Sequence, residues 1–138
     1  MTTINPYLNF NGNAKEAMGF YKDCFGGELM VQTVGESPMA KDMPANTHGN
    51  VMHATLMKEG TILLMGADSM KPDNYKIGNA VIISVNFTSE DEIKSIFEKL
   101  SAGGSVTMPL ADQFWVALFG MLTDKFGHHW MMNHDKKK

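Results

Sequence analysis

The sequence predicts an α+β fold in which a strand–helix–strand–strand–strand unit occurs twice. Each half of the chain shows the same order of strand-like and helix-like patterns and ends in a hairpin. The halves also match residue by residue, because a shift of 77 positions carries Gly26-Gly27 to Gly103-Gly104 and Leu8-Asn9-Phe10 to Val85-Asn86-Phe87. We expect one domain over residues 1–138, with half-modules at about 1–68 and 79–134. The apolar core of each half is too small for that half to be stable alone. The halves should therefore pack together or with a second chain.

In the first half, alternating apolar residues predict a strand over 4–10. Apolar residues at three- and four-residue spacing predict a helix over 14–25, which Gly26-Gly27 ends. The remaining predicted elements are a strand at 28–33, a long loop at 35–50, hairpin strands at 51–57 and 61–65, and a second long loop at 66–79.

In the second half, a nearly continuous apolar run predicts a strand over 80–87. Thr88 or Ser89 then caps a helix, because Ser89-Glu90-Asp91-Glu92 has the spacing of a capping box. The buried stripe of this helix is predicted at Ile93, Ile96, Phe97 and Leu100. Gly103-Gly104 ends the helix, and a strand opens at 106–108.

The last hairpin is the predicted wall of a binding cavity. Alternation over 113–120 predicts a strand, Asp124-Lys125-Phe126-Gly127 predicts a turn, and 128–132 predicts the returning strand. This assignment places Trp115 and Trp130 on partner strands. Each tryptophan either lines the cavity or holds the hairpin in the core, and the pattern leaves both roles open.

Composition narrows the class of protein. Hydrophobic content of 43% and charged content of 20% are globular values, and no apolar run is long enough to span a bilayer. A net charge of −3 argues against nucleic acid as a partner. The single cysteine, Cys24, and the absence of a signal-peptide pattern predict a cytoplasmic location. Thirteen methionines supply side chains that fill irregular space and adapt to ligands.

Several stretches together resemble one superfamily. They are Asn5-Pro6-Tyr7-Leu8 with Phe20-Tyr21, His53-Ala54 followed by Leu64-Met65-Gly66-Ala67-Asp68, and Trp115…Thr123-Asp124-Lys125-Phe126-Gly127…Trp130-Met131-Met132-Asn133. The whole chain resembles the vicinal oxygen chelate superfamily (glyoxalase, bleomycin resistance and extradiol dioxygenase), and within it the PhnB-like branch. The resemblance implies two βαβββ modules that form curled mixed sheets around a cavity, and a homodimer.

The resemblance also raises the question of a metal. Metal-dependent members take His and Glu ligands from the first and last strands of each half. The equivalent positions here are about Pro6, a residue within 80–84, Leu64 and Met131. None is a carboxylate or an imidazole, so we expect neither a metal site nor another cofactor.

The candidate ligand-binding residues are therefore Tyr7, His53, Asp68, Trp115 and Trp130. The aromatic members have polar tips and suit a flat or cationic small molecule. His53 is either a hydrogen-bonded wall residue or a ligand, and Asp68 either orients a ligand or caps a turn. No catalytic residue is assigned.

The expected function is binding of a small molecule without the usual metal centre. One alternative is an enzyme of the lyase or dioxygenase type with a non-standard site around His53 and Asp68. A second is a drug-sequestering resistance protein. A methyltransferase, the function after which the PhnB-like branch was once labelled, is not expected, because the chain lacks a doubly wound sheet with a Gly-rich loop after its first strand.

Overall fold

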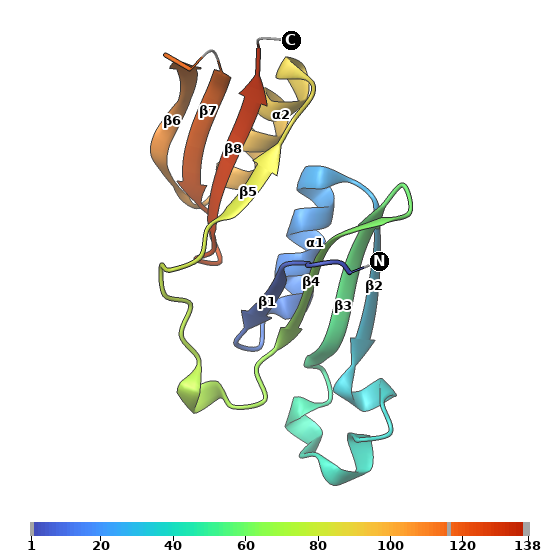
Figure 1. Cartoon of the computed structure of the whole chain (residues 1–138). Helices are drawn as coiled ribbons and strands as arrows, with labels where there is room; N and C mark the ends of the chain where they lie inside the picture. The colour runs from blue at the N-terminus through green and yellow to red at the C-terminus, as the bar shows by residue number, and fades with distance from the viewer. Residues whose placement is uncertain (1, 116, 137–138) are drawn as a thin grey trace. The chain divides into compact units, whose positions relative to one another are not determined.

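Two four-stranded mixed sheets, each with one helix packed on one face, make up the protein (Figure 1). The computed structural model describes residues 2–115 and 117–136. The chain divides into two compact units, Met1–Lys76 and Ile77–Lys138. The predicted α+β class with two βαβββ modules is confirmed.

The first unit has the strand order β1-β4-β3-β2, with β1 parallel to β4 and the other pairs antiparallel. Its elements are β1 (Tyr7–Phe10), α1 (Ala14–Phe25), β2 (Glu28–Thr33), β3 (Val51–Lys58) and β4 (Thr61–Asp68). The long predicted loop between β2 and β3 contains three short 3-10 helices, Val34–Glu36, Ala40–Asp42 and Ala45–Thr47, and a fourth lies at Pro72–Asn74. The bounds predicted for α1 and β2 are confirmed, and the first strand is shorter than predicted.

Helix α1 covers one face of this sheet. In each unit, we call the face of the sheet that the helix does not cover the open face. Its apolar stripe (Ala14, Ala17, Met18, Tyr21, Cys24) is buried. Gly66 lies directly beneath it, since a Cβ there would come within 3.2 Å of the Met18 Sδ and the Phe10 ring. Because successive strand residues point to opposite faces, Leu64 and Gly66 face the helix and Met65 faces away from it.

The second unit repeats the arrangement with the strand order β5-β8-β7-β6 and β5 parallel to β8. Its elements are β5 (Ile83–Asn86), α2 (Glu90–Ser101), β6 (Ser105–Gln113), β7 (Ala117–Thr123) and β8 (His129–Asp135). Ser89 caps α2 as predicted, accepting a hydrogen bond from the Glu92 amide. The predicted stripe Ile93, Ile96, Phe97 and Leu100 is buried.

The prediction that Trp115 and Trp130 lie on partner strands is wrong. Gln113 ends β6 and pairs with Ala117 at the start of β7, so Phe114 and Trp115 lie in the turn between these strands. The alternating run thus crosses a chain reversal, which alternation alone does not reveal. Val116, part of that predicted strand, lies outside the described residues.

The two hairpins also differ in register. Matching Gly60 to Gly127 predicts that Leu64 corresponds to Met131. In the sheets, Tyr7 pairs with Met65 and its counterpart Ser84 pairs with Met131. Met65 is therefore the equivalent of Met131, one residue from the prediction. A two-residue turn at Glu59-Gly60, with a register shift nearby in β3–β4, replaces the longer turn of the second unit and accounts for the offset.

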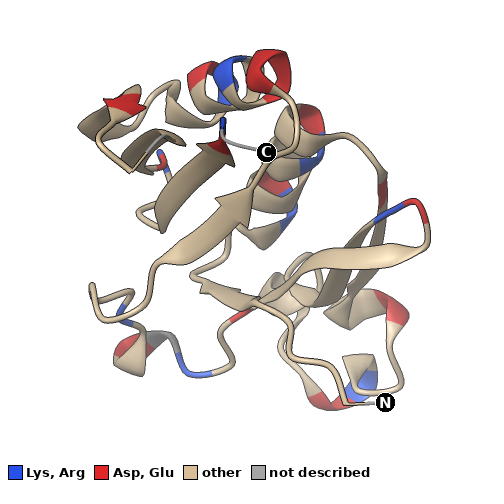
Figure 2. Cartoon of the chain, turned by 45° about the horizontal axis from the view of Figure 1, so that its top comes forward, with Lys and Arg blue, Asp and Glu red and all other residues tan. Residues whose placement is uncertain are grey.

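Charge is concentrated outside the sheets. Charged side chains lie mainly on the helices and loops, and the strands are mostly uncharged (Figure 2). In the described parts of the chain, no helix has the length and apolar character needed to cross a bilayer.

Asp124 provides a first test of what holds the second unit together. Its carboxylate is buried and accepts hydrogen bonds from the Trp130 indole at 2.8 Å and from the backbone amides of Phe126 and His128. Removing these acceptors by Asp124→Ala leaves buried donors unsatisfied, so the free energy of unfolding should fall by about 2–4 kcal/mol. Urea denaturation followed by tryptophan fluorescence measures this change.

Asp112→Ala is the matched control, because Asp112 is exposed and pairs only with Lys136 among the described side chains. An exposed ion pair contributes less than about 1 kcal/mol. Equal destabilisation by the two variants would contradict the anchoring role of Asp124.

Candidate ligand-binding site

Tyr7, His53 and Thr55 form a hydrogen-bonded chain on the open face of the first sheet. The Tyr7 hydroxyl lies 3.1 Å from His53 Nδ1, and the Thr55 hydroxyl lies 2.9 Å from His53 Nε2. The strand register brings them together, because Tyr7 and Thr55 both pair with Met65, from opposite sides of β4. Two of the predicted site residues, Tyr7 and His53, are thus in direct contact.

This chain keeps the imidazole partnered in either protonation state. A hydroxyl group both donates and accepts, whereas a ring nitrogen of neutral histidine does one or the other. Neutral His53 accepts from one hydroxyl and donates to the other, and protonated His53 donates to both. A hydroxyl partner at each ring nitrogen therefore fixes the orientation of the imidazole.

Two hollows lie beside the hydrogen-bonded Tyr7–His53–Thr55 side chains. One, of about 510 Å³, has Tyr7 and Asp68 in its lining and is otherwise bounded by Asn9, Met39, Met52, Ala67, Ser69, Met70 and Lys71. The other, of about 320 Å³, is lined by Met30, Val31, Gln32, His53 and Thr55. The methionines around them were not predicted as site residues. The high methionine content was the only sequence signal, and it does not identify positions.

Asp68 is the last residue of β4 and is buried. Its Oδ1 accepts the Ala14 amide at the start of α1, and its Oδ2 accepts the Val51 amide at the start of β3. An acceptor at a helix N-terminus is also favoured by the helix dipole. The structural role considered from the sequence was a cap of the turn that follows Asp68, whereas these contacts join the starts of α1 and β3.

The two tryptophans have different environments. Trp130 is almost fully buried in β8 and donates its indole N–H to Asp124, as a residue that holds the hairpin does. Trp115 is 46% exposed and packs edge-on against Phe114 and Phe119, with centroid distances of 5.0 and 5.6 Å. Exposure at the turn leaves Trp115 accessible to a ligand.

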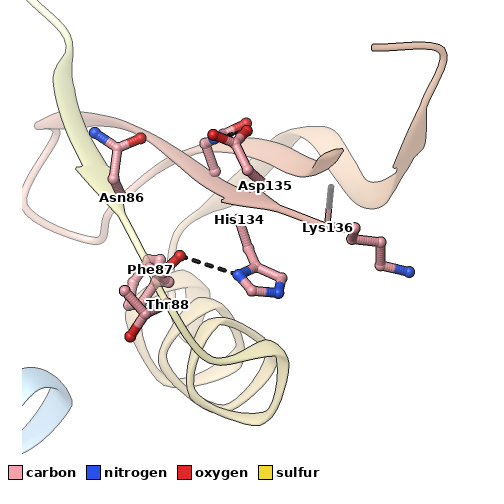
Figure 3. Close-up of a pocket in the computed structure, with 7 residues that line it drawn as sticks. Asn86, Phe87, Thr88, His134, Asp135 and Lys136 are labelled. Atoms are coloured by element: carbon pink, nitrogen blue, oxygen red, sulfur yellow. Dashed lines mark hydrogen bonds between the residues drawn. The ribbon is translucent and has the colours of Figure 1, made fainter. Parts of the chain in front are cut away.

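A more polar hollow lies at the end of β5 and β8 in the second unit (Figure 3). It has a volume of about 310 Å³ and is lined by Asn86, Phe87, Thr88, Asn133, His134, Asp135 and Lys136. His134 Nδ1 donates to the Phe87 carbonyl at 3.0 Å, and Lys136 pairs with Asp112 and Glu90. The hydrogen bond to Asp112 raises the pKa of Lys136. Within the lining, Asn133 also donates to Asp135 at 3.0 Å.

The positions at which the fold suggests metal ligands carry poor donors for a divalent ion. The open-face residues at the paired first and last strands are Tyr7 with Met65, and Ser84 with Met131. Leu64, the predicted position, faces α1 and is buried. Zinc and iron sites use imidazole, carboxylate or thiolate ligands. Across residues 2–115 and 117–136, no group of three or more His, Cys, Asp or Glu is placed to hold an ion. None of Tyr7, Met65, Ser84 and Met131 supplies an imidazole, a carboxylate or a thiolate.

Comparison with known proteins identifies the family. The glyoxalase/bleomycin resistance protein/dioxygenase superfamily matches residues 3–132. The chain belongs to this superfamily. It is a PhnB-like member, similar to YjdN of Escherichia coli (strain K12), with 31% identity over 142 residues that cover 98% of this chain and 97% of YjdN.

Two solved structures are also similar. The protein PA1353 from Pseudomonas aeruginosa has 40% identity and a TM-score of 0.86, with 98% of each chain covered. The PhnB protein from Bacillus cereus has 29% identity and a TM-score of 0.75, with 96% of this chain and 99% of that chain covered. The predicted resemblance to the PhnB-like branch is confirmed.

Tyr7 offers a test of the environment of the hydrogen-bonded chain. Burial raises the pKa of its phenol above the ordinary 10.0. The neutral phenol is then favoured by folding, and its contribution to stability is present below pH 10 and is lost as the pH rises through the folded-state pKa. A tyrosinate absorbance titration of the wild type minus that of Tyr7→Phe should give a midpoint above 10.0. A midpoint at or below 10.0 would contradict this assignment.

Proposed function

We propose that this protein binds a small organic molecule on the open face of the first sheet, without a divalent metal centre. The observation that carries the proposal is the Tyr7–His53–Thr55 chain, which lies between two hollows. Its hydroxyl and imidazole groups provide hydrogen-bond donors and acceptors, and the methionine and aromatic side chains provide apolar contact. A flat compound with one polar edge fits this combination.

Trp115, in the second unit, is a separate candidate ligand contact, because it is exposed and packs beside Phe119. Asp68 and Trp130 have a structural role in this proposal, since their polar atoms already form hydrogen bonds with protein groups. A single domain of two half-modules, a homodimer and a cytoplasmic location complete the proposal. A mass in solution of twice the chain mass, measured by light scattering, tests the dimer.

Binding is tested with small carbonyl, catechol and flat cationic compounds, screened by ligand-observed NMR. For a compound that binds, His53→Ala and Tyr7→Phe should each weaken affinity by about two- to tenfold, the equivalent of one lost hydrogen bond. His134→Ala is the matched control, because it removes a histidine from the other unit. Equal weakening by all three variants, or by none, would remove the proposed site.

The absence of a divalent centre is tested by metal analysis. Protein purified from cells supplied with Ni, Zn, Fe and Mn should contain well below one ion per chain, because Tyr7, Met65, Ser84 and Met131 are poor ligands for these ions. A near-stoichiometric content of any of the four would overturn this part of the proposal. Thermal stability should also be unchanged by EDTA, since no bound divalent ion contributes to the folded state.

A second candidate function is an enzyme that uses His53 for proton transfer. The specific observation in its favour is that a hydroxyl lies within hydrogen-bond distance of each ring nitrogen of His53. We leave Asp68 out of this role, because both its oxygens accept hydrogen bonds from backbone amides. Turnover in the same compound screen separates enzyme from binder. His53→Gln should lower kcat by about 100-fold or more while binding persists.

A further inference from the structure

Three methionines occupy paired positions on neighbouring strands of the second sheet. Met131 on β8 pairs with Met121 on β7 in a regular ladder. Met121 in turn pairs with Met108 on β6, where the β6–β7 register shifts on both sides of Met108. Directly opposed residues in a sheet point to the same face, with Cβ atoms about 4.5–5.5 Å apart. The three thioether side chains therefore lie side by side on adjacent strands.

This methionine row (Met108, Met121, Met131) lies on the face that α2 does not cover. On β7, Met121 alternates with Gly120, where a Cβ would come within 2.8 Å of the Phe97 ring of α2. On β8, Met131 alternates with the buried Trp130 and Met132. Met108 is 39% exposed, and the other two are half-buried, so the row is accessible from solvent in this unit.

The donor atoms of the row are soft and neutral. Thioether sulfur favours Cu(I) over the harder divalent ions, and methionine is flexible enough to converge on a shared ligand. Two harder donors on the same face bond to other groups. His129 bonds through both ring nitrogens, to the Thr123 hydroxyl and the Gly78 carbonyl, and Asp135 accepts from Asn133.

We propose that Met108, Met121 and Met131 bind one Cu(I) ion. The proposal does not rest on the small-molecule function, because it uses a different sheet and different donors. The first unit has no such row at the equivalent positions, which are Tyr7, Met65, Thr55 and Met30 in order across the sheet. Thr55 lies between the two methionines there. Met65 is the counterpart of Met131 and provides the matched control.

The test uses Ag(I), a soft monovalent ion that is stable in air, and calorimetric titration of the full chain. Cys24→Ala is the background, because a thiolate would compete for the ion. One ion should bind per chain. Met121→Leu keeps the apolar volume and removes a ligand, so binding should weaken by about 100-fold or more, given that loss of an outer-shell partner alone costs about 10- to 100-fold. Met65→Leu should bind as the background does.

Tryptophan fluorescence gives a second readout. Trp115 packs against Phe119, two residues from Met121 on β7, so Ag(I) should change its emission. Trp115→Phe should abolish most of the change without altering stoichiometry. Met131→Leu replaces Met121→Leu if the latter unfolds. Absence of Ag(I) binding would overturn the proposal. Equal binding by the Cys24→Ala background, by Met121→Leu (or Met131→Leu in its place) and by Met65→Leu would also overturn it and would identify the row as an ordinary apolar surface.

Discussion

Each sheet has a single helix against which to bury its apolar side chains, and this constraint shapes both units. One face of each sheet must be apolar and closely packed, as the contacts of Gly66 with Met18 and of Gly120 with Phe97 illustrate. The helix leaves the residues of the other face free of that demand. Both sites that we propose therefore lie on the two open faces.

The open faces have diverged although the scaffold is repeated. In the first unit, the row across the strands contains Tyr7 and Thr55, and His53 lies within hydrogen-bond distance of both. In the second unit, the same row contains serine followed by three methionines. Because side chains alternate between faces, these substitutions leave the helix-facing core unchanged. A repeated fold can thus carry a polar site in one unit and a soft, polarisable surface in the other.

Buried carboxylates in both units serve the backbone. Asp68 joins the start of α1 to the start of β3, and Asp124 joins the last turn to Trp130. A buried carboxylate requires such donors, since an unpaired charge in the interior is strongly unfavourable. Acidic residues beside strands therefore do not identify a ligand or metal site until their partners are known. Membership of the superfamily likewise identifies the fold, and the donor set decides whether its metal chemistry is retained.

Local patterns determined much of this protein by themselves: the two βαβββ modules, the bounds of α1 and β2, the cap at Ser89 and the buried stripe of α2. These features depend on neighbours within a few residues, which the sequence displays directly. The turn at Trp115, the equivalence of Met65 with Met131 and the contact of Tyr7 with His53 were decided by tertiary structure. Strand pairing joins residues far apart in the chain, and a register change of one residue moves a side chain to the opposite face, so local pattern alone could not resolve them.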